Sequence, residues 1–90
     1  MPKILIPTPL RQYTGKQDTV HVKGATVGEA LTALWAQEPQ VRGYVLDDQG
    51  RLRKHVCIFA DGARLPHAAA LAHRIKPETK LYVMQALSGG

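Results

Sequence analysis

The sequence is short of cysteine, of aromatic residues and of long apolar runs, and each shortage excludes a class of protein. Its single cysteine, Cys57, cannot form an intramolecular disulfide. No basic stretch followed by a long apolar run marks the N-terminus for secretion, so we expect a cytoplasmic protein. The longest apolar runs, residues 56–60 and 68–72, are far shorter than the roughly 20 residues of a membrane-spanning helix. We therefore expect no transmembrane segment.

Length and charge restrict further the class of protein to which this chain can belong. With 90 residues, of which 44% are hydrophobic, the chain has the composition of one small globular domain. A domain of this size buries only about 60–65% of its unfolded surface, which leaves little protein to enclose a deep catalytic pocket. We therefore expect no free-standing enzyme. The 12 basic and 7 acidic residues give a net charge of +5, which attracts an acidic partner or nucleic acid without requiring either.

Several short segments have strand character. Residues 3–6 form a β-rich run that ends at a proline, and residues 19–23 alternate valine with polar residues, which is typical of a strand buried on one face. Residues 55–60 form a third strand that ends at an Asp-Gly turn, after which residues 64–65 return briefly. Residues 80–85 form the last strand.

One helix is clearly marked. Apolar residues recur at helical spacing over residues 27–37, which predicts a helix with one buried stripe. Thr26 followed by Glu29 is the T-x-x-E capping box that begins a helix. Pro39 discourages continuation of this helix, and the stretch that follows, through residue 50, is polar and rich in turn residues.

The order of these elements predicts an α+β fold. A hairpin, a helix and then further strands give the outline of the β-grasp (ubiquitin-like) fold, a mixed sheet of four or five strands packed on one main helix. Residues 68–75 add a segment of short helical character. We expect the domain to span residues 1–86, followed by a flexible tail of residues 87–90.

The last two residues, Gly89 and Gly90, have two interpretations. The simpler one is a frayed end. In the other, the tail with Leu87, Ser88 and Gly89 threads a narrow channel in a partner, because glycine has no Cβ and four residues reach about 14 Å. The carboxylate of Gly90 would then react: ATP converts it to an acyl-adenylate, and sulfur displaces AMP to leave a thiocarboxylate. This chemistry requires no catalytic side chain from the chain itself.

Three parts of the sequence resemble the MoaD/ThiS family of ubiquitin-like sulfur carriers: the T-x-x-E helix start, residues 56–62 (VCIFADG) and residues 86–90 (ALSGG). The resemblance spans the whole chain. Residues 6–15 (IPTPLRQYTG) are most similar to the CysO branch, whose members deliver sulfide for cysteine synthesis and begin with a similar I-P-T-x-L-R segment. One departure from the family pattern is residues 76–80 (KPETK), where many family members carry D-G-D before the last strand. A Pro-Glu turn can form the same backbone turn.

This resemblance implies partners rather than cofactors bound by the chain. An E1-like adenylating enzyme of the MoeB/ThiF type would activate Gly90 with ATP and Mg²⁺, a sulfur donor would form the thiocarboxylate, and a downstream synthase would consume it. In the CysO branch that synthase is PLP-dependent, and a zinc metalloprotease releases the amino acid from the carrier. We expect this chain to bind neither cofactor nor metal. The resemblance does not identify the sulfur-containing product.

The alternation in the last two long strands predicts a docking face. With one set of side chains turned toward the helix, the intervening residues lie on the opposite face and form an apolar patch. This predicted patch comprises Cys57, Phe59, Tyr82 and Met84. We interpret it as a partner-docking surface, with a covering loop as the alternative.

The densest basic cluster is centred on Arg51, Arg53 and Lys54. Nucleic-acid binding is disfavoured, because one tryptophan, one phenylalanine and three tyrosines leave few platforms for base stacking. A solvated basic face is the default interpretation, and the functional one is electrostatic steering toward an acidic partner. The histidines lack the spacing of a metal site: His21, His55, His67 and His73.

Three functions are compatible with these features. The leading hypothesis is a sulfur carrier activated at Gly90. The second is a ubiquitin-like modifier that is joined to lysines of target proteins through the same carboxylate. The third is a non-covalent β-grasp binding module, which would tolerate removal of the terminal glycines.

Overall fold

A five-stranded mixed sheet organises the molecule, in the order β2-β1-β5-β3-β4. In this computed structural model, residues 1–85 are described. The strands are β1 (Lys3–Leu5), β2 (Thr19–His21), β3 (Val56–Ala60), β4 (Ala63–Arg64) and β5 (Lys80–Gln85). The helices are α1 (Val27–Gln37) and α2 (Pro39–Val45), with 3-10 turns η1 (Thr8–Tyr13) and η2 (His67–Ala69). Within residues 1–85 no helix has the length and apolar character needed to cross a bilayer.

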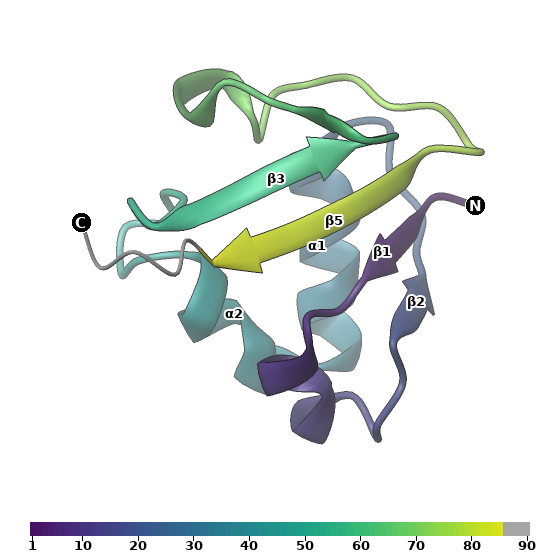
Figure 1. Cartoon of the computed structure of the whole chain (residues 1–90), viewed down its shortest axis with the longest axis vertical. Helices are drawn as coiled ribbons and strands as arrows, with labels where there is room; N and C mark the ends of the chain where they lie inside the picture. Colours follow the sequence, from purple (N-terminus) through teal and green to yellow (C-terminus); the bar gives the residue numbers. More distant parts are fainter. Residues whose placement is uncertain (86–90) are drawn as a thin grey trace.

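The strand β5 lies at the centre of the sheet, between β1 and β3 (Figure 1). It runs parallel to β1 and antiparallel to β3, whereas β1 and β2 form an antiparallel hairpin. The long connection from β2 to β3 contains both α-helices, and α1 covers one face of the sheet. This arrangement confirms the predicted β-grasp fold with a mixed sheet packed on one main helix.

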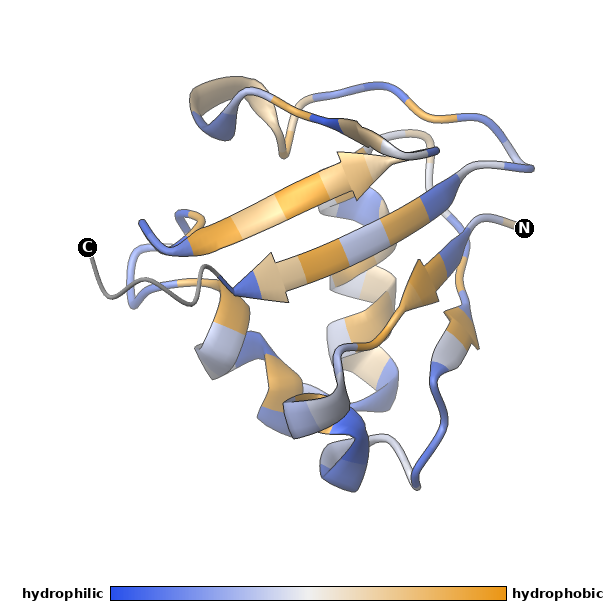
Figure 2. Ribbon diagram, in the orientation of Figure 1, coloured by the Kyte–Doolittle hydropathy of each residue, from blue (hydrophilic) through white to orange (hydrophobic). Residues whose placement is uncertain are grey.

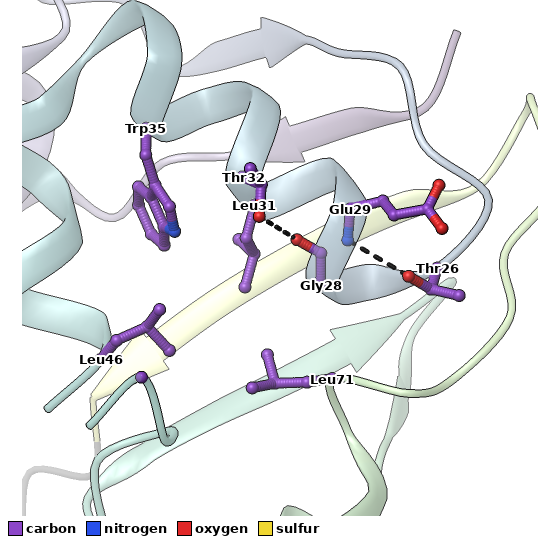
Figure 3. Close-up of a pocket in the computed structure, with 9 residues that line it drawn as sticks. Thr26, Gly28, Glu29, Leu31, Thr32, Trp35, Leu46 and Leu71 are labelled. Atoms are coloured by element: carbon purple, nitrogen blue, oxygen red, sulfur yellow. Dashed lines mark hydrogen bonds between the residues drawn. The ribbon is translucent and has the colours of Figure 1, made fainter.

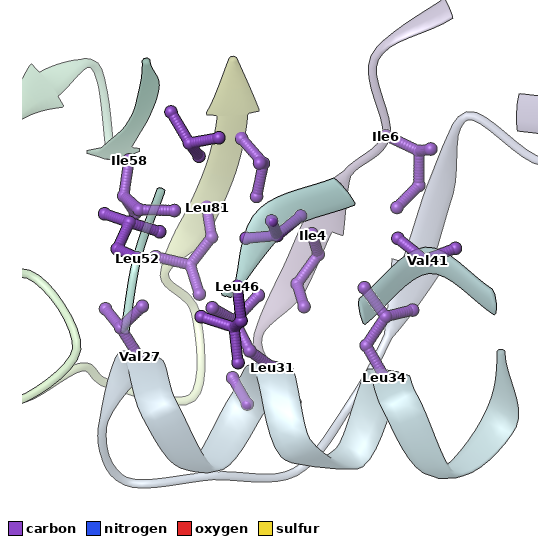
Figure 4. Packing of buried hydrophobic residues seen from close by; sticks show 14 of the residues in the cluster. Ile4, Ile6, Val27, Leu31, Leu34, Val41, Leu46, Leu52, Ile58 and Leu81 are labelled. Atoms are coloured by element: carbon purple, nitrogen blue, oxygen red, sulfur yellow. The ribbon is translucent and has the colours of Figure 1, made fainter. Parts of the chain in front are cut away.

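The hydrophobic core fills the space between the sheet and α1 (Figure 4). Leu31 and Leu34 project from α1 toward Ile4, Ile58 and Leu81 on three neighbouring strands, and all five side chains are buried. Burial of each large aliphatic side chain contributes roughly 1.5–3 kcal/mol to folding. The core therefore occupies one face of the sheet and leaves the other face open.

The start of α1 follows the predicted capping box. The Thr26 hydroxyl oxygen accepts a hydrogen bond from the backbone N–H of Glu29 at 3.2 Å, and the Glu29 carboxylate accepts one from the N–H of Ala25 at 3.0 Å. The first two helical amides, of Val27 and Gly28, donate to backbone carbonyls in the loop after η2. Every amide of the first turn thus has a partner, and the predicted helix at residues 27–37 is confirmed.

The predicted Asp-Gly turn is also confirmed. Asp61 and Gly62 have φ angles of 49° and 87°, so both lie in the left-handed region that the tight hairpin turn between β3 and β4 requires. The Asp61 carboxylate accepts the backbone N–H of Lys80 at 3.0 Å. This bond joins the turn to the beginning of β5.

The prediction of a turn-rich stretch after Pro39 is wrong in its first half, where α2 forms. Pro39 occupies the first turn of α2, where its missing N–H removes no helical hydrogen bond. Val41 and Val45 lie four residues apart on one face and are buried. The same proline that ends α1 therefore begins a second helix.

Smaller differences concern element boundaries. The two N-terminal strands are shorter than the predicted segments 3–6 and 19–23, and η1 replaces part of the loop between them. Of the helical character predicted for residues 68–75, only the short turn η2 forms. The remainder of that segment instead supplies carbonyls to the start of α1.

Candidate functional site

The predicted reactive segment at the C-terminus follows β5 in the sequence. Its last residue, Gln85, is paired with Val56, the first residue of β3. The predicted reactive residue Gly90 lies outside the described residues, as does the predicted threading segment Leu87, Ser88 and Gly89. The roles of these residues remain predictions. What the structure describes is the end of β5 at Gln85, which the last five residues follow in the sequence.

The four predicted docking residues lie together on the open face of the sheet. In the register of β3 and β5, Cys57 is opposite Met84 and Phe59 is opposite Tyr82. Tyr82 and Met84 are 38% and 41% exposed, and Cys57 and Phe59 are half-buried. We call these four residues the open-face patch. Figure 2 shows that β3 is hydrophobic along its whole length, and its half-buried residues Cys57 and Phe59 supply half of this patch.

The alternation that predicted this patch is confirmed by burial. On β3, Val56 and Ile58 are buried against α1, and on β5 so are Leu81 and Val83. Cross-strand neighbours stand roughly 4.5–5.5 Å apart at Cβ, so the four opposite side chains form a continuous surface. A large exposed apolar surface on a small domain is typical of an interaction site.

A groove that sequence reasoning missed extends this surface. It has a volume of about 240 Å³ and lies between the start of η1 and the end of β5, with mostly apolar walls. Pro7, Pro9 and Leu10 line one side, and Tyr82, Met84 and Gln85 line the other. In the sequence, Pro7 marks only the end of the first strand. Their place beside β5 follows from the parallel pairing of β1 with β5, which the local sequence does not encode.

The predicted basic residues divide into structural and exposed positions. Arg53 donates from its backbone N–H to the carbonyl of Val45 at 3.0 Å and from Nε to the carbonyl of Gly43 at 2.9 Å. These bonds satisfy carbonyls at the end of α2. Lys54 is exposed, and because Val56 pairs with Gln85, Lys54 lies near the end of β5.

Arg51 belongs to a turn built around Asp47. The Asp47 carboxylate accepts the backbone N–H groups of Arg51 and Gln49, each at 2.9 Å. The bond from Arg51, followed by that from Gln49, holds the pKa of Asp47 below its ordinary value. The Arg51 guanidinium also contacts this carboxylate at 4.0 Å and bonds to the Gln49 side chain. Asp47 therefore stabilises this turn.

Over residues 1–85, no three His, Cys, Asp or Glu side chains come close enough together to hold a metal ion. His67 is engaged through Nε2 with the carbonyl of Arg53 at 2.9 Å. An exposed tyrosine pair, Tyr13 and Tyr44, shares a hydrogen bond of 2.6 Å, which raises the pKa of Tyr13.

Known proteins share this architecture. The ThiS family model matches residues 4–90. The sulfur carrier protein CysO of Mycobacterium tuberculosis is 28% identical over 97% of this chain and 96% of its own. The crystal structure of small archaeal modifier protein 1 from Haloferax volcanii has a TM-score of 0.82 at 25% identity, covering 96% of this chain and 97% of that one.

A further solved structure has the same fold as this chain. The Amycolatopsis orientalis BexX/CysO complex contains a chain that superposes with a TM-score of 0.89 at 23% identity, with both chains fully covered. The family match covers nearly the whole sequence, and the CysO relative carries sulfur by its description. The chain therefore belongs to the ThiS family, and it is similar over nearly its whole length to a sulfur carrier protein, CysO.

Proposed function

We propose that this carrier is loaded at the carboxylate of Gly90, which becomes a thiocarboxylate. A carboxylate oxygen attacks the α-phosphorus of ATP and pyrophosphate leaves, giving an acyl-adenylate. Sulfide from a donor then attacks the carbonyl carbon, and AMP leaves with the bonding electron pair. The observation that carries this proposal is the family match, which extends through Gly90 at the end of the segment that follows β5.

The enzymes of this cycle are partners in the proposal. An E1-like adenylating enzyme of the MoeB/ThiF type would supply ATP and Mg²⁺, and it would dock on the open-face patch and the adjoining groove. The crystallised complex of a related CysO with BexX supports a carrier that works by docking to another protein. The chain then contributes an accessible surface and a reactive terminus and leaves catalysis to its partners.

We propose that the carried sulfur serves the biosynthesis of a cysteine- or homocysteine-type amino acid or of another sulfur metabolite. The similarity to CysO supports this assignment. A PLP-dependent synthase would consume the thiocarboxylate, and a zinc metalloprotease would release the amino acid from Gly90. Both cofactors would belong to the partners.

The proposal is tested by the intact mass of the carrier isolated from its native host. Exchange of one oxygen for sulfur raises the mass by about 16 Da, and fragmentation should place the increase in the C-terminal peptide. This localisation is essential because oxidation of Cys57 or a methionine adds nearly the same mass. A carrier that stays unmodified after incubation with its activating enzyme, ATP and sulfur donor would contradict loading at Gly90.

A second function uses the same carboxylate. The likeness to small archaeal modifier protein 1 favours a protein modifier that is joined to target lysines through Gly90. The mass experiment separates the two, since conjugation yields high-mass adducts with an isopeptide bond rather than a small mass increase. A non-covalent binding module would yield neither product.

Electrostatic steering gives a further prediction. We expect Lys54→Glu to slow association with an acidic activating enzyme roughly fivefold at low ionic strength, because Lys54 is exposed near the start of the tail. Stopped-flow measurement over a salt series checks this, and the difference should shrink as salt increases. Lys23→Glu is the matched control, since it changes the charge equally just after the far edge strand β2. Equal rates for both variants would exclude steering by this cluster.

A further inference from the structure

Three basic side chains form a row across the open face of the sheet, at the end where β1 and β5 begin. Lys3 on β1 is opposite His21 on β2 and opposite Lys80 on β5. The residue next to each of them along its strand is buried in the core, so all three lie on the open face. His21 and Lys80 are exposed, and Lys3 is half-buried. We call these three residues the basic row, and Figure 2 shows the hydrophilic beginnings of β1 and β5 side by side.

The basic row has no acidic partner among the described residues. Within residues 1–85, the one ion pair joins Arg51 to Asp47. The carboxylate of Asp61 lies beside the beginning of β5, where it accepts the backbone N–H of Lys80 at 3.0 Å. Glu78, two residues before β5, is exposed and forms no ion pair in this part of the chain. Like charges on opposite residues of neighbouring strands repel each other, so the two lysines lower the stability of the sheet.

The basic row is continuous with the open-face patch. Tyr82 of the patch lies two residues beyond Lys80, and it is opposite Leu5 on β1 and Phe59 on β3. Leu5 is half-buried and lies on the same face. Residues two positions apart along a strand stand about 7 Å apart. A protein that covers the apolar patch would therefore also reach the basic row.

The helix side of the molecule differs in charge. The hollow beside Trp35 has a volume of about 440 Å³ and mostly apolar walls (Figure 3). Among the described residues that line it, Glu29 is the one with a charge, and its carboxylate already accepts the backbone N–H of Ala25 at 3.0 Å. Apolar side chains thus adjoin a group of basic ones on the open face and not in this hollow.

We propose that the basic row binds carboxylates of the partner protein that docks on the open-face patch. This inference rests on the proposed function, in which the activating enzyme docks there. The charge of the row selects an acidic surface, and the apolar side chains directly beside it favour a protein over a nucleic acid. The row lies about 17 Å from the end of β5, because five residues separate Lys80 from Gln85. Contact at the patch and at the row together fixes the orientation of the carrier on the enzyme.

Carbodiimide cross-linking tests this contact on the intact chain. The carrier is mixed with its cognate adenylating enzyme without ATP or sulfur donor, so the result does not depend on chemistry at Gly90. The reagent joins a lysine Nζ to a carboxylate that touches it and takes up the water released. We expect peptide mass spectrometry to find Lys3 or Lys80 joined to an aspartate or glutamate of the enzyme. Lys16, in the turn before β2, should form no such link.

Charge reversal measures the effect of the row on affinity. Lys3→Glu combined with Lys80→Glu should weaken binding to the enzyme roughly tenfold or more, mainly through faster dissociation. Lys16→Glu combined with Arg42→Glu is the matched control, since both residues are exposed, lie away from the row and give the same total charge change. This control should change the dissociation rate by less than about twofold. Surface plasmon resonance measures the rates, and circular dichroism establishes that each variant is folded.

A milder variant separates binding from stability. Lys80→Gln removes one of two opposed charges at an exposed position, so the midpoint of thermal unfolding should stay the same or rise. The affinity for the enzyme should nevertheless fall about threefold. A lower unfolding midpoint together with wild-type affinity would show that the row serves the fold and would overturn the proposal.

Other outcomes would also overturn it. These are equal dissociation rates for the row variant and the control variant, or enzyme cross-links that avoid Lys3 and Lys80. Binding of an unrelated single-stranded DNA that is as tight as that of the enzyme, and is lost in the row variant, would replace the protein partner by a nucleic acid. Normal sulfur loading with an inert row would contradict this inference alone. Loss of loading at Gly90 with the row effect retained would contradict the proposed function alone.

Discussion

Removal of Gly89 and Gly90 is expected to abolish sulfur loading while changing the free energy of unfolding by less than about 0.5 kcal/mol. The truncated chain still ends in a carboxylate, at Ser88, but that group is withdrawn by up to about 7 Å from the position of the original one. An adenylating site requires its reactants within near-contact distance, so such a displacement prevents attack on ATP. The stability should persist because, within residues 1–85, every buried core residue precedes residue 84.

The measurements are ATP–pyrophosphate exchange and mass analysis, with thermal unfolding as the control for folding. Replacement of both glycines by alanine is the matched variant, since it keeps the length and the carboxylate but adds two Cβ atoms. A narrow channel should reject this variant as well. Loading of the truncated chain at the wild-type rate would overturn the assignment of Gly90 as the reactive residue.

Phe59→Asp is expected to lower kcat/KM for activation by the cognate adenylating enzyme roughly 30-fold or more, which corresponds to about 2 kcal/mol. Phe59 is half-buried next to Tyr82 in the open-face patch, and an aspartate there would place an unpaired charge in a desolvated interface. Steady-state adenylation kinetics at several carrier concentrations measure the effect. The change should appear mainly in KM, because the substitution is remote from the reacting carboxylate.

Thr19→Asp provides the matched control on the same face of the sheet. Thr19 lies on β2, three strands away from β3, and is half-buried like Phe59. Its substitution should change kcat/KM by less than about twofold if the patch, and not the whole sheet, contacts the enzyme. Normal kinetics for a folded Phe59→Asp variant would show that docking occurs elsewhere.

The local sequence predicted those features that depend on local periodicity. The capping box of Thr26 and Glu29 set the start of α1, and alternation in β3 and β5 separated core side chains from the open face. The helix α2 could also have been predicted, because Pro39 suits the first turn of a helix and Val41 and Val45 share one face. The helix was missed because this stretch is polar and rich in residues that favour turns.

The surfaces formed by these elements were harder to predict from the sequence. Which open-face residues face each other depends on strand register, which pairs Phe59 with Tyr82 through contacts far apart in sequence. The groove beside Pro9 requires the parallel pairing of β1 with β5. The hollow beside Trp35 requires the loop of Leu71 to pack against α1. Such features arise only when separate segments meet, so no local pattern predicts them.

The central position of β5 has a mechanical consequence. Under the proposed function, an enzyme that draws the last residues into its active site would pull on the end of β5, and this strand is hydrogen-bonded on both sides, to β1 and β3. The pull therefore acts on two rows of hydrogen bonds in shear, which must fail together, rather than peeling one edge strand bond by bond. Fraying of the edge strands β2 and β4 leaves this anchor intact. The fold thus holds its tail by the strand that is hardest to extract.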